Sequence, residues 1–151
     1  MNNPPRNGEG DRSAQPSGGG GRPIGTRSIP VVIKALWSAG FVIGTITHTL
    51  DIATFGWLPY VFMPLGFNIY WTSLVFFDPL AAVLIWWRPA WALWLGSVIM
   101  ASDVLINAWT VFGAGFSDIL PSLGFQAIFA AFVFYVAIRH KPSPQSSPDT
   151  Q

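Results

Sequence analysis

Two aspartates are the residues of this chain best placed to do acid–base chemistry, because each lies near the middle of a long apolar stretch. Asp78 and Asp103 have no basic neighbours: there is no Lys or Arg between Lys34 and Arg88, nor between Arg88 and Arg139. An ionised group in the middle of a bilayer is costly, so such residues face a bundle interior or a cavity and are functional candidates. We therefore predict that Asp78 and Asp103 are the catalytic residues of an intramembrane site.

The absence of basic neighbours limits what these acids can do. A buried Asp in this setting must be neutralised by a proton, by a bound cation, or by hydrogen bonds from neighbouring side chains or water. A protonated carboxyl in an apolar cavity can act as a general acid on an alkene, an epoxide or another uncharged lipid-like molecule, and aromatic faces can stabilise the resulting carbocation. The same group also suits proton-coupled transport or the binding of an amine.

Six further side chains are candidates for binding or orienting a substrate. They are His48, Asp51, Asn68, Trp71, Asn107 and Gln126. His48 and Asp51 are three residues apart and so share one face of a helix, which means that His48 either faces a ligand or simply pairs with Asp51. Trp71 and Asp78 are seven apart and also share a face. One histidine with scattered aspartates lacks the ligand spacing of a metal site, so we predict no metal.

The composition is that of a single membrane domain. Of the 151 residues, 51% are hydrophobic and 10% are charged, whereas soluble domains carry about 25% charged residues. The net charge of +1 argues against a nucleic-acid partner, which requires a basic face. There is no Cys, which excludes disulfide and thiolate chemistry. We expect the lipid bilayer and an apolar small molecule as partners, and no cofactor.

Four apolar stretches predict four transmembrane helices, because an α-helix of about 20 residues crosses a bilayer core of about 30 Å. We place them at residues 29–50, 66–87, 90–112 and 118–138. The predicted fold is an all-α membrane protein, a four-transmembrane-helix bundle over residues 29–138. Residues 1–28 and 139–151 are rich in Gly, Pro and Ser. These segments have too little apolar surface to offset the entropy of ordering, so we predict disordered tails.

Residues 52–65 form the longest predicted connection, and they combine prolines with aromatic residues. Proline breaks a spanning helix and aromatic side chains anchor at the membrane interface, so we predict an interfacial cap that is a plain connector or a lid. Gly40 and Gly44 precede it as a G-x-x-x-G pair, which would let another helix approach closely.

The basic residues predict the orientation. All eight Lys and Arg lie in the two tails, at the start of the first helix or in the turn between the second and third helices. By the positive-inside rule, both termini are cytoplasmic and the protein is a multi-pass protein of the inner membrane. The polar residues of all four helices then lie in the outer half. We predict a cavity there, open to the outer face or sideways to the outer leaflet, with Asp78 and Asp103 at its floor.

Three short sequences carry resemblances to membrane proteins. His48-Thr49-Leu50-Asp51, Asp78 and Asp103 resemble the intramembrane acids of the sterol-isomerase-like (emopamil-binding, EXPERA) group, which bind amines and protonate sterol double bonds. The same acids resemble those of small integral-membrane terpene cyclases, although both families often use Glu. The segments Asn68-Ile69-Tyr70-Trp71-Thr72 and Phe77-Asp78-Pro79-Leu80 look like small bacterial membrane proteins of unassigned function.

Three functions therefore stand as hypotheses. The first is cyclisation or isomerisation of an isoprenoid-like substrate, with Asp78 or Asp103 as the acid and with His48, Asn107 and Gln126 orienting the carboxyls or the substrate. The second is a small proton-coupled transporter or exporter, as a homodimer, that uses the same aspartates. The third is a structural subunit of a larger membrane complex, in which the polar groups join helices.

Overall fold

The structure is a computed structural model that describes residues 28–140, so the predicted tails lie almost wholly outside the described residues. The described part is all-helical. Its long helices are α1 (Val31–Phe55), α2 (Leu65–Trp87), α3 (Pro89–Ala108) and α4 (Leu120–Arg139). A π-helix, η1 (Trp109–Gly113), continues α3, and a 3-10 turn, η2 (Ser117–Ile119), leads into α4. All four long segments are long and apolar enough to span a membrane. The prediction of an all-α protein with four candidate membrane spans is confirmed.

Prolines and a glycine set the ends of these helices. Pro30 and Pro64 immediately precede α1 and α2, and Pro89 is the first residue of α3. Proline suits these positions because the first N–H groups of a helix have no partner within the helix. Gly56 ends α1 with a φ of 84°, a left-handed conformation that favours glycine. α1 therefore continues past residue 50 to Phe55, and the connection to α2 is shorter than we expected.

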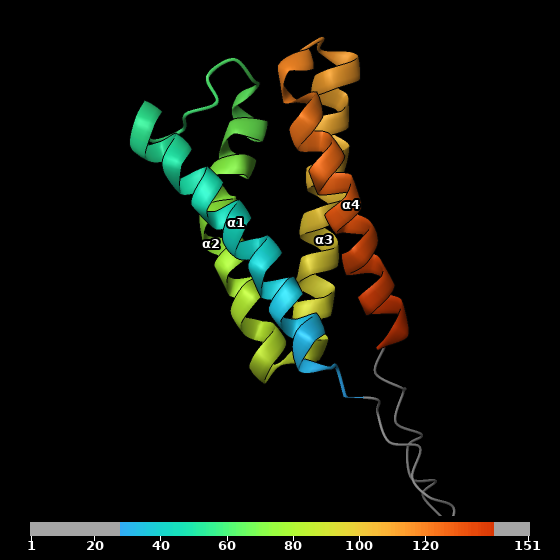
Figure 1. Cartoon of the computed structure of the whole chain (residues 1–151). Coiled ribbons are helices and arrows are strands. Elements are labelled where there is room, and N and C mark those ends of the chain that lie inside the picture. Colours follow the sequence, from blue (N-terminus) through green and yellow to red (C-terminus); the bar gives the residue numbers. More distant parts are fainter. Residues whose placement is uncertain (1–27, 141–151) are drawn as a thin grey trace, which may run out of the picture.

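The helices pack in sequence order, and the bundle has two different ends. α1 packs on α2, α2 on α3 and α3 on α4, whereas contact between α1 and α4 is sparse. We call the end with the 56–64 connection and the 113–117 turn the loop end, and the end with Ser28, Arg88 and His140 the tail end. α1 leans away from α4 toward the loop end (Figure 1). The two halves of the bundle are therefore packed differently.

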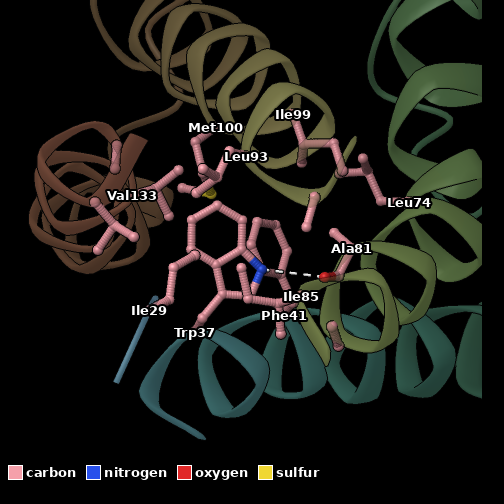
Figure 2. Packing of buried hydrophobic residues seen from close by; sticks show 14 of the residues in the cluster. Ile29, Trp37, Phe41, Leu74, Ala81, Ile85, Leu93, Ile99, Met100 and Val133 are labelled. Atoms are coloured by element: carbon pink, nitrogen blue, oxygen red, sulfur yellow. Dashed lines mark hydrogen bonds between the residues drawn. The ribbon is translucent and has the colours of Figure 1, made fainter. Parts of the chain in front are cut away.

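The tail-end half is closed by a core centred on Trp37. This side chain is 0% exposed, and its indole N–H donates a hydrogen bond to the carbonyl of Ala81, 3.1 Å away. It belongs to a cluster that includes Ile85 of α2 and Val133 of α4 (Figure 2). Gly96 of α3 lies against the indole, and a Cβ there would collide with the ring. All four helices thus meet at one large aromatic side chain.

Candidate functional site

A cavity of about 420 Å³ lies in the loop-end half, where α1 and α4 diverge. All four long helices contribute to its wall. The polar side chains that line it are Thr47, His48, Asp78, Asp103, Ser122 and Gln126. The remaining lining is glycine, aliphatic, Met and aromatic, and includes the rings of Phe41, Phe125 and Phe129. The wall is therefore mainly apolar, with a few polar groups, which is typical of small-molecule sites.

The cavity opens sideways between α1 and α4. Ile43 of α1 and Phe125 of α4 both line it, yet they are 65% and 76% exposed on the outer surface of the bundle. Side chains that line a cavity and are also exposed mark its mouth. This surface belongs to helices that are apolar enough to span a membrane. In a bilayer, the mouth would face the acyl chains of the lipids.

Asp78 is buried on α2 and lies against α1. It is 4% exposed and lines the cavity. Its carboxyl oxygen lies directly over Gly44, where a Cβ would collide with it. No side chain or backbone group of the described residues is hydrogen-bonded to this carboxyl. Both of its oxygens keep some accessible surface, and the residue lines the cavity. Among the described residues, Asp78 is therefore a buried acid without a hydrogen-bond partner, and it faces a mainly apolar cavity.

Asp103 lies in the same cavity but is firmly held. It is 5% exposed, and its Oδ1 accepts a hydrogen bond of 3.0 Å from the side-chain amide of Asn107. The same amide nitrogen donates to Oε1 of Gln126 at 2.9 Å, which joins α3 to α4. The indole of Trp71 also lies within hydrogen-bonding reach of this carboxyl. Asp78 and Asp103 are close enough to interact electrostatically.

A tyrosine of the connection joins His48 and Asp51 of α1. Nδ1 of His48 lies 2.8 Å from the hydroxyl oxygen of Tyr60, and this hydroxyl donates to Oδ2 of Asp51, also at 2.8 Å. Burial, followed by the hydrogen bond to Asp51 and the charge of that residue, raises the pKa of the Tyr60 phenol. The hydroxyl therefore keeps its proton throughout the physiological pH range.

Asn68 holds the 56–64 connection in place. Its Oδ1 accepts from the backbone N–H of Tyr60 at 3.1 Å, and its Nδ2 donates to the carbonyl of Leu58 at 3.0 Å. The ring of Tyr60 also packs edge-on against Trp71, with centroids 5.0 Å apart. Trp71 thus contacts the connection on one side and Asp103 on the other. The connection is therefore an anchored cap over the loop ends of α1 and α2 (Figure 1).

The structure divides the predicted site residues into two groups. Those that line the cavity are Asp78, Asp103, His48 and Gln126. Asp51, Asn68, Trp71 and Asn107 lie behind them, as hydrogen-bond or ring partners of the lining residues or of the cap. The described residues hold no group of three or more His, Cys, Asp or Glu side chains that could ligate a metal.

Sequence reasoning did not identify Tyr60 as a site residue. In the sequence, Tyr60 is one of several aromatic residues of the connection that predict anchoring at the membrane interface. The spacing of His48 and Asp51 does signal a polar cluster at this point. However, nothing local in the sequence indicates which ring of the connection folds back to them.

No protein-family model matches the chain, and no curated protein or solved structure shows significant similarity to it. The geometry of the cavity therefore carries the functional argument. The resemblances to the sterol-isomerase-like group, to membrane terpene cyclases and to small bacterial membrane proteins stay predictions.

A Gly44→Ala substitution tests the position of the Asp78 carboxyl. We expect it to destabilise the protein by about 1–3 kcal/mol, because the new methyl group would overlap the carboxyl of Asp78 and force it to move. The measurement is reversible unfolding in mixed micelles. Gly124→Ala is the control, since a Cβ there meets nothing within 4 Å. Adding Asp78→Ala should relieve the cost of Gly44→Ala, and additive effects would show that the two residues are not in contact.

Proposed function

We propose that the protein is a membrane enzyme that isomerises or cyclises an uncharged isoprenoid-like molecule by acid–base chemistry. The carboxyl of Asp78, which has no hydrogen-bond partner among the described residues and faces a cavity that opens toward the bilayer, carries this proposal. A buried polar group that only joins helices is expected to have a hydrogen-bond partner. Asp103, Asn107 and Gln126 fit such a joining role in part, because their bonds link α3 to α4. Asp78 does not.

The two acids have different surroundings, which supports different roles. We assign the proton to Asp78, because no donor in the described residues stabilises its charged form. We assign the carboxylate to Asp103, which accepts from Asn107. Two carboxyls in one apolar cavity share a proton more readily than they both ionise.

The reaction then balances without an oxidant or a reductant. Asp78 gives its proton to one carbon of a C=C bond, the π electrons form the new C–H bond, and the neighbouring carbon becomes a carbocation. The rings of Phe41 and Phe129 line the cavity and can stabilise this cation. Asp103 removes a proton from an adjacent carbon and a π bond forms again. The product is an isomer of the substrate, and exchange with water then resets the acids by removing the proton from Asp103 and returning one to Asp78.

The size and the mouth of the cavity fit such a substrate. A volume of about 420 Å³ falls within the range of about 300–1,000 Å³ that small-molecule sites occupy. A lipid-soluble molecule could enter between α1 and α4 directly from the acyl-chain region. It would not have to cross an aqueous phase.

We also propose that the protein lies in the inner membrane with both termini cytoplasmic and the loop end outside. The positions of all eight basic residues support this orientation. The protein has no cysteine, so single cysteines introduced by mutation can report the orientation. A membrane-impermeant maleimide should label Ser117→Cys in intact cells and leave Ser28→Cys unlabelled until the cells are lysed. The opposite labelling pattern would show that the proposed orientation is wrong and that both termini lie outside.

A second candidate function is proton-coupled export of a hydrophobic cation. The cavity contains two carboxyls and is lined by no Lys or Arg of the described residues, which favours a bound cation. Transport would require the core around Trp37 to open, since this core closes the tail-end half. Such a protein could act as a homodimer.

One experiment separates the two candidates. The full chain is reconstituted in liposomes in D₂O with farnesene or squalene. The enzyme proposal expects an isomeric product that carries one deuterium from the solvent, detected by mass spectrometry. The transporter alternative expects unchanged alkenes and a pH-gradient-driven movement of tetraphenylphosphonium. Unchanged alkenes without deuterium would overturn the enzyme proposal.

A further inference from the structure

We propose that Asp51, Tyr60 and His48 form a proton path between the loop-end surface and the acidic cavity. The inference deepens the proposed function and rests on it, because acid–base chemistry in the cavity requires proton exchange with water. It assigns to the cap a role beyond covering the bundle. It also gives Tyr60, which the sequence placed only at the interface, a place in the site.

The path is a continuous chain of hydrogen bonds. His48 lines the cavity, and its Nδ1 lies 2.8 Å from the hydroxyl oxygen of Tyr60. That hydroxyl donates to Asp51 at 2.8 Å. Asp51 is only partly buried and lies near the loop end of α1. Three side chains therefore connect the inside of the cavity with the end of the bundle that borders the aqueous phase.

The position of the mouth explains why such a path is needed. The cavity opens between α1 and α4, beside the exposed Ile43 and Phe125. In a bilayer this opening admits lipid rather than water. The core around Trp37 closes the tail-end side. A carboxyl in the cavity can thus exchange protons with water only through the loop end.

Holding the cap does not account for the two bonds of the Tyr60 hydroxyl. Asn68 already fixes the backbone at Leu58 and Tyr60 through both ends of its amide. The ring of Tyr60 is placed independently by its contact with Trp71. The hydroxyl is left to bridge a histidine and a carboxylate, an arrangement suited to passing a proton.

The proton transfers balance at each step. In the resting arrangement, Nδ1–H of His48 donates to the Tyr60 oxygen, and the Tyr60 hydroxyl donates to the Asp51 carboxylate. A proton taken from the cavity at Nε2 of His48 is matched by the loss of the Nδ1 proton to Tyr60, which passes its own proton to Asp51. The reverse steps, starting from protonated Asp51, bring a proton in. Tyr60 carries no charge at the end of either sequence.

The charged groups around the path agree with this role. The charge of Asp51 acts on both His48 and Tyr60, and the charge of Asp103 acts on Tyr60 from α3. Burial and Asp51 raise the pKa of the Tyr60 phenol. The hydroxyl therefore transfers protons as a neutral relay and does not ionise.

The test measures proton exchange of the buried acids without any substrate. The full chain is reconstituted in phosphatidylcholine and phosphatidylglycerol bilayers for infrared spectroscopy. The C=O stretch of a protonated carboxyl is assigned to the cavity by its loss in Asp78→Asn or Asp103→Asn. At a pH where this band is half developed, the medium is switched from H₂O to D₂O. The rate at which the band shifts is the rate of proton exchange with water.

We expect Tyr60→Phe to slow this exchange at least about tenfold, because it removes both hydrogen bonds and keeps the ring contact with Trp71. Asp51→Asn should slow the proton exchange as well, and it changes the cap less than Tyr60→Phe does. Tyr70→Phe is the matched control, since that half-buried hydroxyl bonds to Ser102 on α3. The control should exchange at the wild-type rate.

The outcomes separate this inference from the proposed function. Wild-type exchange in folded Tyr60→Phe and Asp51→Asn would overturn the path and point to entry past Ser122 and Gln126, which also line the cavity. Equal slowing in Tyr70→Phe would show a general effect on the bundle and would also overturn it. Slowed exchange in Tyr60→Phe and Asp51→Asn alone, with no conversion of any alkene, would support the path while the enzyme proposal failed.

Discussion

An Asp78→Asn variant should fold normally and lose its activity. We expect the rate of solvent deuterium incorporation into the alkene product to fall at least about a hundredfold, the usual contribution of a positioned general acid. Asparagine has nearly the same shape as aspartate but cannot donate a carboxyl proton. Because Asp78 has no hydrogen-bond partner to lose among the described residues, the free energy of unfolding should change by less than about 1 kcal/mol. Both quantities are measured on the same reconstituted protein.

The control for this variant is Asp118→Asn. Asp118 is an exposed acid in η2 and does not line the cavity, so its replacement should change neither activity nor stability. Asp103→Asn should lose activity as well, while its side-chain oxygen can still accept from Asn107. A strongly destabilised Asp78→Asn would instead indicate that this carboxyl holds helices together. A stable variant with full turnover would remove Asp78 from the mechanism.

Trp37→Ala should have the largest effect on stability. We expect a loss of about 3–5 kcal/mol, the usual cost of truncating a fully buried tryptophan. In a membrane, helix association depends on close packing and on hydrogen bonds between helices. The substitution removes both, because the indole fills the space beside Gly96 and donates to the Ala81 carbonyl. The measurement is equilibrium unfolding in mixed micelles of increasing dodecyl sulfate content.

Trp87→Ala is the matched control for this substitution. Trp87 lies at the end of α2 and is 76% exposed, so its loss should cost less than about 1 kcal/mol. If Trp37→Ala costs no more than this control, the tail-end core is not what holds the bundle together. The transporter alternative, which requires that core to open, would then become the better proposal.

Stability and chemistry are separated along the bundle. The tail-end half holds the fully buried Trp37, around which all four helices close. In the loop-end half, α1 stands apart from α4, and this half contains the cavity, the two acids and the anchored cap. A buried carboxyl without a partner is costly, and it is tolerated where a rigid neighbouring core fixes the helices that carry it. This separation is what allows site variants to be tested without unfolding the protein.

The sequence alone was enough to predict the helices and the candidate acids. The information that predicts them is local. An apolar run of about 20 residues predicts a membrane span. Proline can begin a helix, as Pro89 does in α3, because the N–H group that it lacks would have no partner there. An acid such as Asp78, in the middle of an apolar run, is conspicuous for the same reason. The predicted end of the first helix, at residue 50, was less accurate. Gly56, rather than the last residue of the apolar run, stops α1.

The tertiary structure alone decided which polar groups meet. The rotation of each helix about its axis is set by contacts between residues far apart in the sequence, such as Gly44 with Asp78. Those contacts left the carboxyl of Asp78 without a hydrogen-bond partner in the described residues and gave Asp103 one in Asn107. The same long-range packing brought Tyr60 to His48. Sequence spacing describes one helix at a time, whereas a site between four helices depends on how they are turned toward each other.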